Sequence, residues 1–274
     1  MAIFIGFIIG IIAYVIEYLG KGIQKFSIEG WKTDKSVKSK HTGYFIIGTI
    51  LTSTYVFIQW VALIFAPVNL IAPLESLGLI VLIIFSYFIL KEEISKKQIV
   101  GIILILIGTI FMTLFNLNTG DIQYADFNQF SFLIFTIILV LAEVVAILVS
   151  KFNSYKAAGL IIGTSAGTFM ALQTVTKRIT AIPDPMLALI FTFLSFGVTI
   201  MTFLLTQFAF AKANANIVVP CFTSASIIIA ILIGVIALSE EIILIQILGI
   251  IIIFIGVILL TGFRKNETFE EKGK

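Results

Sequence analysis

The sequence predicts an all-α integral membrane protein with nine transmembrane helices in two repeats of opposite orientation. Composition, apolar segments of span length and the placement of charges lead to this prediction. Of the 274 residues, 59% are hydrophobic and only 12% are charged, about half the roughly 25% typical of soluble domains. So few charges cannot cover a soluble globule, which excludes an ordinary soluble enzyme and a nucleic-acid-binding module.

Nine segments have the length and apolar character of membrane spans. A bilayer core about 30 Å thick requires roughly 20 mostly apolar helical residues. Charged residues bound the fourth segment at Lys97 and Asp121 and the sixth at Lys156 and Lys177, and Lys212 separates the seventh from the eighth. The nine segments are 2–20, 42–64, 67–90, 98–120, 128–149, 157–176, 185–211, 213–239 and 242–263.

The first segment is expected to remain as a span. No basic region precedes it, and Glu17 lies late within it, so it does not have the pattern of a cleaved signal peptide. The predicted loops are short except for 21–41, and we therefore expect 1–274 to form a single domain.

The basic residues predict the orientation. Sixteen of the eighteen lysines and arginines fall on one alternating set of loops and the C-terminal tail, and Lys177 and Arg178 are the two exceptions. Because lysine and arginine concentrate on cytoplasmic loops, the N-terminus is expected outside and the tail 264–274 in the cytoplasm. We expect a multi-pass protein of the plasma membrane.

Two parts of the chain align as an internal repeat. Residues 66–115 match 213–262 if one residue is inserted, and Gln59 and Gln207 precede the two blocks at similar positions. The matched pairs are Pro73 with Pro220, Glu92-Glu93 with Glu240-Glu241, and Gly108 with Gly256. The acidic pairs fall on opposite sides of the membrane, which predicts inverted repeats over 1–118 (four spans) and 127–263 (five spans). Inverted repeats are typical of secondary transporters that bind substrate near the midplane and work by alternating access.

The repeated residues resemble the drug/metabolite transporter superfamily. The shared pattern consists of an alanine, a proline, an acidic pair, a glutamine and two glycines: Ala66, Pro73, Glu92/Glu93, Gln98, Gly101 and Gly108, then Ala213, Pro220, Glu240/Glu241, Gln246, Gly249 and Gly256. Within it the chain is similar to NIPA-type magnesium transporters at Gly20-Lys21-Gly22, the run 65–74, Leu90-Lys91-Glu92, and Gly163, Gly167 and Lys177. That resemblance implies nine spans and transport of a divalent cation, with Mg²⁺ as the first candidate.

A second resemblance concerns the first span. Glu17 followed by Lys25 is similar to the first helix of small multidrug resistance proteins, in which a glutamate binds protons and cations. Aligning span 1 with span 6 places Glu17 over Gln173 and Lys21 over Lys177, and this pairing agrees with inverted repeats.

Three acidic residues, Glu17, Glu75 and Glu143, lie within predicted spans and are the main site candidates, because a charge inside the bilayer is costly and often functional. A helical rise of 1.5 Å per residue places Glu75 about 12 Å from the outer face and the other two about 21–22 Å from it. All three could face one cavity, although Glu17 could instead pair with Lys21. Candidate amide ligands are Gln59, Asn69, Gln173, Gln207, Asn214 and Asn216, each of which could equally bond another helix.

Glu75 and Glu143 are the candidate Mg²⁺ ligands, because Mg²⁺ takes oxygen ligands and keeps several waters. His41 is the single histidine and Cys221 the single cysteine, which argues against a zinc or copper site and excludes an intrachain disulfide.

The leading hypothesis is therefore a secondary transporter of Mg²⁺, with the ion as substrate and no cofactor. The alternative is a proton-coupled exporter of organic cations, amino acids or other small metabolites. A lipid-handling enzyme or scaffold is disfavoured by the repeat, and the sequence contains neither a phosphate-binding loop nor a catalytic triad. The expected partners are the lipid bilayer and a small cation or metabolite, with no nucleic acid; a homodimer is left open.

Overall fold

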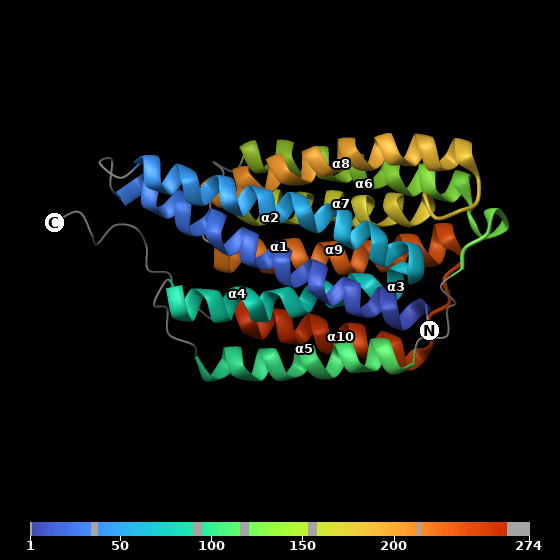
Figure 1. The fold of residues 1–274 in the computed structure, drawn as a ribbon, viewed down its shortest axis with the longest axis horizontal. Coiled ribbons are helices and arrows are strands. Elements are labelled where there is room, and N and C mark those ends of the chain that lie inside the picture. The colour runs from blue at the N-terminus through green and yellow to red at the C-terminus, as the bar shows by residue number, and fades with distance from the viewer. Residues whose placement is uncertain are drawn as a thin grey trace.

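The computed structural model describes residues 2–33, 38–89, 95–115, 121–152, 158–212 and 215–261. Within these ranges the chain consists of helices and loops, which confirms the all-α prediction. The α-helices are α1 (Ala2–Thr33), α2 (Lys38–Phe65), α3 (Val68–Ile71), α4 (Glu75–Ile89), α5 (Lys96–Leu114), α6 (Gln129–Phe152), α7 (Ala158–Ile179), α8 (Pro185–Lys212), α9 (Ala215–Leu238) and α10 (Leu244–Thr261). The long helices lie side by side with their axes along one common direction (Figure 1).

Six stretches of the described residues are long and apolar enough to cross a membrane. They are Ala2–Ile28, Ser39–Phe65, Val68–Ile89, Gln129–Leu148, Pro185–Ala211 and Cys221–Leu238. Two shorter apolar stretches, Ile99–Leu114 and Leu244–Leu259, lie in α5 and α10. The protein is thus a multi-pass membrane protein, while the count of nine crossings and their orientation stay predictions.

The prediction of a loop over 21–41 is wrong for most of this range. Helix α1 continues to Thr33, and α2 begins at Lys38. Lys21 is buried instead of lying in a loop, because its ammonium lies 2.7 Å from the Glu17 carboxylate one helical turn earlier. The ion pair removes the need for Lys21 to reach water. Helix α1 also packs tightly on α2 here: a Cβ on Gly20 would lie 2.8 Å from the carbonyl oxygen of Gly48.

Pro73 interrupts the third predicted span. The span is built from α3, a 3₁₀ turn over Ala72–Leu74, and α4. Proline has no N–H to donate and its ring crowds the preceding turn, so the regular α-helical ladder stops there and restarts at Glu75. The partner proline in the predicted repeat, Pro220, lies within the continuous helix α9. The two aligned segments therefore differ in backbone structure.

Apolar side chains cover the outside of the molecule. The most exposed examples are Leu114, Phe130, Phe193 and Leu244, which lie on α5, α6, α8 and α10. Such a surface fits contact with lipid tails. Helices α1 and α7, by contrast, carry half of the buried polar residues of the described chain, so the candidate site residues lie inside the bundle.

Glycines bring α5 and α10 into close contact. A Cβ on Gly108 would lie 2.6 Å from the carbonyl oxygen of Gly249, and one on Gly249 would lie 2.9 Å from that of Gly108. A Cβ on Gly256 would meet the carbonyl oxygen of Gly101 at 2.8 Å. Small residues on facing helices permit this close packing. The contacts are reciprocal, as expected for two helices at equivalent places in a repeat.

We expect Gly108→Ala to destabilise the protein by about 1–3 kcal/mol, because the new methyl group would meet backbone atoms that cannot rotate away. The measurement is the thermal denaturation midpoint of the detergent-purified protein. Gly197→Ala is the matched control, since nothing lies within 4 Å of its added Cβ. Equal effects of the two substitutions would contradict this packing.

Candidate functional site

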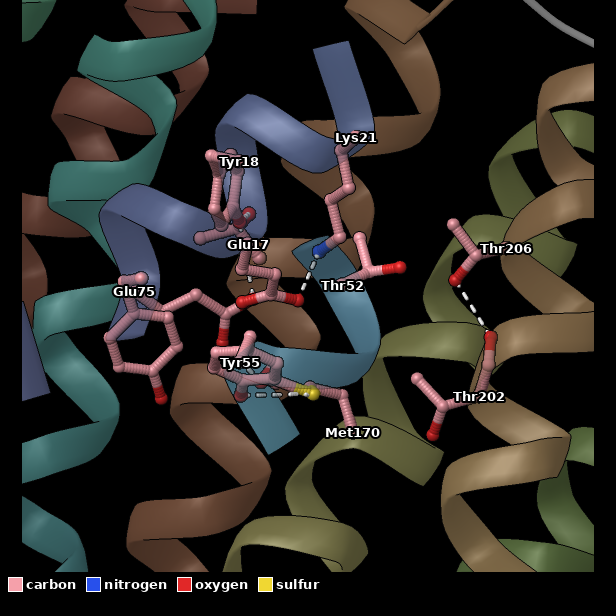
Figure 2. Close-up of polar contacts among 12 residues, drawn as sticks. Glu17, Tyr18, Lys21, Thr52, Tyr55, Glu75, Met170, Thr202 and Thr206 are labelled. Carbon is pink, nitrogen blue, oxygen red and sulfur yellow. Dashed lines mark hydrogen bonds and ion pairs between the residues drawn. The ribbon is translucent and has the colours of Figure 1, made fainter. Parts of the chain in front are cut away.

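One face of α1 carries four buried residues with polar groups, Tyr14, Glu17, Tyr18 and Lys21. They are spaced i, i+3, i+4 and i+7, which places them in a row on one side of the helix. Besides its 2.7 Å pair with Glu17, the Lys21 ammonium lies 4.4 Å from the centre of the Tyr18 ring and 3.7 Å from that of Phe222. Figure 2 shows the Glu17–Lys21 pair beside Tyr18. Aromatic faces attract a cation and help to hold this lysine inside the protein.

Glu75 is the first residue of α4 and is fully buried. Its carboxylate accepts a hydrogen bond of 3.2 Å from the Tyr18 hydroxyl of α1 and another from the Ser226 hydroxyl of α9. Tyr18 also shares a 2.6 Å hydrogen bond with Thr223. The carboxylate thus lies where α1, α4 and α9 meet, between the two predicted repeats; Figure 2 shows it next to Tyr18 and Glu17.

Lys177 extends the cluster toward α2 and α7. The fully buried Lys177 ammonium donates a 2.6 Å hydrogen bond to Gln59 Oε1. The amide nitrogen of Gln59 donates to the hydroxyls of Tyr14 at 3.0 Å and Thr174 at 3.1 Å. Lys177 also lies 5.3 Å from the centre of the Tyr55 ring. Gln59 therefore connects α1, α2 and α7.

Electrostatic interactions join these groups into one site. Glu17 interacts with Lys21 and Lys177, and Glu75 interacts with Glu17 and Lys21. Three buried atoms in the site have no hydrogen-bond partner in the described structure. Lys21 Nζ has its ion pair with Glu17 Oε1, which leaves Glu17 Oε2 and Gln173 Nε2 without a partner of either kind. Buried polar atoms normally have one, and these two are therefore available to a ligand.

Of the three predicted intramembrane acids, the structure brings Glu17 and Glu75 together and holds Glu143 elsewhere. Half-buried Glu143 accepts hydrogen bonds from Ser165 and, at 2.6 Å, from Thr168 on α7. Helix α6, which carries Glu143, faces outward along most of its length. The proposed metal ligands Glu75 and Glu143 thus have separate sets of partners. No group of three or more His, Cys, Asp or Glu suited to a metal ion occurs among the residues described here.

Two other predicted amides, Gln207 and Asn69, bond other segments of the chain. Gln207 donates a 2.9 Å hydrogen bond to Gln24 of α1, and the side chain of Asn69 donates one of 3.0 Å to the carbonyl of Glu241. Asn214 and the side chain of Asn216 lie outside the described residues.

Glu240 lies in the loop between α9 and α10 and joins the second half of the chain to α3 in the first half. Its two carboxylate oxygens accept the backbone N–H groups of Val68 at 2.7 Å and Asn69 at 2.8 Å. Burial raises the pKa of Glu240, while these two donors and Arg178 oppose the rise. The contact fastens the start of α3 to the loop between α9 and α10.

Sequence reasoning missed the roles of Lys21, Lys177 and Glu240, because it counted all three as loop charges. A signal for the two lysines was present. Each follows a polar intramembrane residue by four positions, Glu17 in one case and Gln173 in the other, and positions i and i+4 share a helix face.

Part of the chain is similar to known membrane transport proteins. Residues 1–114 match the model of the EamA-like transporter family. Over 109 residues the chain is 26% identical to the probable 4-amino-4-deoxy-L-arabinose-phosphoundecaprenol flippase subunit ArnE of Proteus mirabilis (strain HI4320), a match that covers 39% of this chain and 96% of the relative. No solved structure matches the chain.

These similarities support the expected drug/metabolite transporter superfamily and a membrane transporter as the class of protein. They point to transport and not to enzymatic catalysis. They do not extend to magnesium or to the NIPA type.

We expect Glu240→Ala to lower the thermal denaturation midpoint, because each buried N–H left without its acceptor costs about 1–3 kcal/mol. Glu241→Ala is the control: the side chain of Glu241 is exposed, and Asn69 bonds its main-chain carbonyl, which the substitution keeps. A midpoint lowered equally by both variants would show that the Glu240 carboxylate does not stabilise this contact.

Proposed function

We propose that the protein is a proton-coupled secondary transporter of a small amine, in which Glu75 binds a proton and the substrate ammonium in turn. The observation that carries the proposal is the fully buried Glu75 carboxylate, held by Tyr18 from α1 and Ser226 from α9. An ionisable group inside a membrane protein is a functional candidate by default because burying its charge is costly.

The environment of the Glu75 carboxylate suits binding of a proton and of a substrate ammonium group in turn. Two hydroxyl donors and the N-terminal end of α4 favour the ionised form, while burial and the neighbouring Glu17 carboxylate oppose it. The titratable groups that interact with Glu75 are Glu17 and Lys21 and the tyrosines Tyr14, Tyr18 and Tyr55. A proton or an ammonium group would each neutralise the carboxylate, and competition between them couples their movements.

The contacts of Glu75 also suggest how binding affects conformation. Tyr18 and Glu75 belong to the first predicted repeat and Ser226 to the second. Protonation or substrate binding would weaken the hydrogen bond to Ser226 and so loosen the contact between the repeats. In an inverted-repeat transporter the two halves rock against each other around such a site.

The similar flippase subunit agrees with an amine substrate and with the repeat. Its printed name specifies a 4-amino sugar, and an amino group is the kind of ligand a carboxylate binds. Nearly the whole relative matches 39% of this chain, about the extent of the predicted repeat 1–118.

Magnesium transport remains the alternative. Octahedral Mg²⁺ sites use one or two carboxylates together with water and other oxygen ligands. Glu17, however, is paired with Lys21, and Glu143 makes its hydrogen bonds to α7. Glu75 is therefore the fully buried predicted acid without a salt bridge among the described residues, which favours exchange between a proton and a monovalent ammonium over binding of a divalent ion.

The test uses proteoliposomes that contain a pH-sensitive dye and receive an inward gradient of glucosamine, with protein-free liposomes as the background. We expect the protein to export protons in exchange for glucosamine. Glu75→Gln should reduce this exchange at least tenfold, because the neutral amide cannot take up a proton, whereas Glu143→Gln should keep most of it.

A parallel set of liposomes carries a Mg²⁺-sensitive dye. Mg²⁺ flux that depends on Glu75, with no proton flux driven by glucosamine, would reject the proposal in favour of magnesium transport. Equal proton flux in wild type and Glu75→Gln would reject the role of this carboxylate.

A further inference from the structure

Helix α7 presents a buried face with the same spacing as the site face of α1. Four residues at i, i+3, i+4 and i+7 form it, and all are at most 2% exposed: Met170, Gln173, Thr174 and Lys177. Gln59 connects the two faces, since it bonds Tyr14 of α1 and both Thr174 and Lys177 of α7. The site thus has an acidic part at Glu75 and Glu17 and a second part on α7.

The α7 part is a donor surface. Gln173 and Lys177 are one turn apart on the same side of the helix. The Gln173 amide nitrogen has no hydrogen-bond partner among the described residues, and the Lys177 ammonium has three N–H groups, one of which bonds Gln59. Donors gathered in this way, one of them cationic, suit a carboxylate or a phosphate group.

The acidic part offers an acceptor. Glu17 Oε1 is paired with Lys21, but its Oε2 is buried without a hydrogen-bond partner in the described structure. The site therefore has an unused acceptor on α1 and an unused donor on α7. A ligand that satisfies both must itself carry a donor and an acceptor.

Charge balance points to the same ligand. In the substrate-bound state, in which Glu75 has given up its proton, four charged groups lie in the site: the carboxylates of Glu17 and Glu75 and the ammonium groups of Lys21 and Lys177. Their formal charges cancel. A substrate with a net charge would leave one charge uncompensated inside the protein, which is expensive, whereas a zwitterion preserves the balance.

We infer that the substrate is a small zwitterion whose ammonium group is bound at Glu75 and Glu17 and whose carboxylate or phosphate is bound by Lys177 and Gln173. This inference rests on the proposed function and names the class of its substrate.

Ligand binding to the full-length detergent-purified protein tests the inference, with dissociation constants measured by the concentration dependence of ligand-induced thermal stabilisation. The probes share one sugar skeleton. Glucosamine carries only the ammonium group, and 2-amino-2-deoxygluconate adds a singly charged carboxylate, which makes it neutral overall. Glucosamine 6-phosphate adds a phosphate, which gives it a net charge of about −1 at pH 7, and glucose 6-phosphate carries only the anion. We expect one or both zwitterions to bind at least tenfold more tightly than glucosamine, and the comparison of the two distinguishes a carboxylate substrate from a phosphate.

Variants at Lys177 and Gln173 identify the groups responsible. Lys177→Met should abolish the advantage of the zwitterion over glucosamine, because removing one member of a buried charge pair typically costs tenfold or more in affinity. Lys177→Arg keeps the charge and should retain much of that advantage. Gln173→Leu removes the amide donor without altering charge, should reduce the advantage by a smaller factor, and provides a second test if Lys177→Met does not fold.

Three results would overturn the inference: glucosamine binding as tightly as both zwitterions, glucose 6-phosphate binding more tightly than either, or Lys177→Met and Gln173→Leu both retaining the full advantage of the zwitterion. The proposed function would survive each of these if Glu75-dependent proton exchange driven by glucosamine is still observed in liposomes. If that exchange is absent as well, the proposed function fails with the inference.

Discussion

A carboxylate in the interior of a membrane protein must obtain its hydrogen bonds from the protein, and the organisation of this molecule follows from how Glu75 obtains them. Tyr18 supplies one bond from α1 and Ser226 supplies the other from α9. Pro73 interrupts the third span just before Glu75, so that α4 begins with the acidic residue at its positive end. The contact between the two halves of the chain is therefore a polar one at this point.

The remaining contacts divide into fixed and breakable ones. Helices α5 and α10 meet through Gly108 and Gly249, where backbone touches backbone and little adjustment is available. Around Glu75, and where Glu240 binds the start of α3, the halves are joined by side-chain hydrogen bonds. Such hydrogen bonds can be broken when the carboxylate is protonated or when it bonds a ligand or water instead. Rocking of two halves about a central site requires both kinds of contact, some that persist and others that break and re-form.

Much of the fold could be predicted from sequence, because apolar segments of span length have few alternatives to the helix in a bilayer. The end of the first helix was predicted wrongly, because Lys21 was counted as a loop residue although pairing with Glu17 allows its burial. Which of the intramembrane acids share a site depends on helix packing: Glu17 and Glu75 meet, whereas Glu143 lies on an outward-facing helix and bonds α7.

The central claim is that Glu75 changes its protonation state when substrate binds. Infrared difference spectroscopy of the full-length protein, recorded with and without glucosamine, reports this directly through the carbonyl stretch of a protonated carboxyl group. The account predicts that glucosamine removes a protonated-carboxyl band, that the change is absent in Glu75→Gln, and that it is retained in Glu143→Gln. A band change that persists in Glu75→Gln, or a wild-type protein whose spectrum shows no such change while glucosamine is bound, would contradict it.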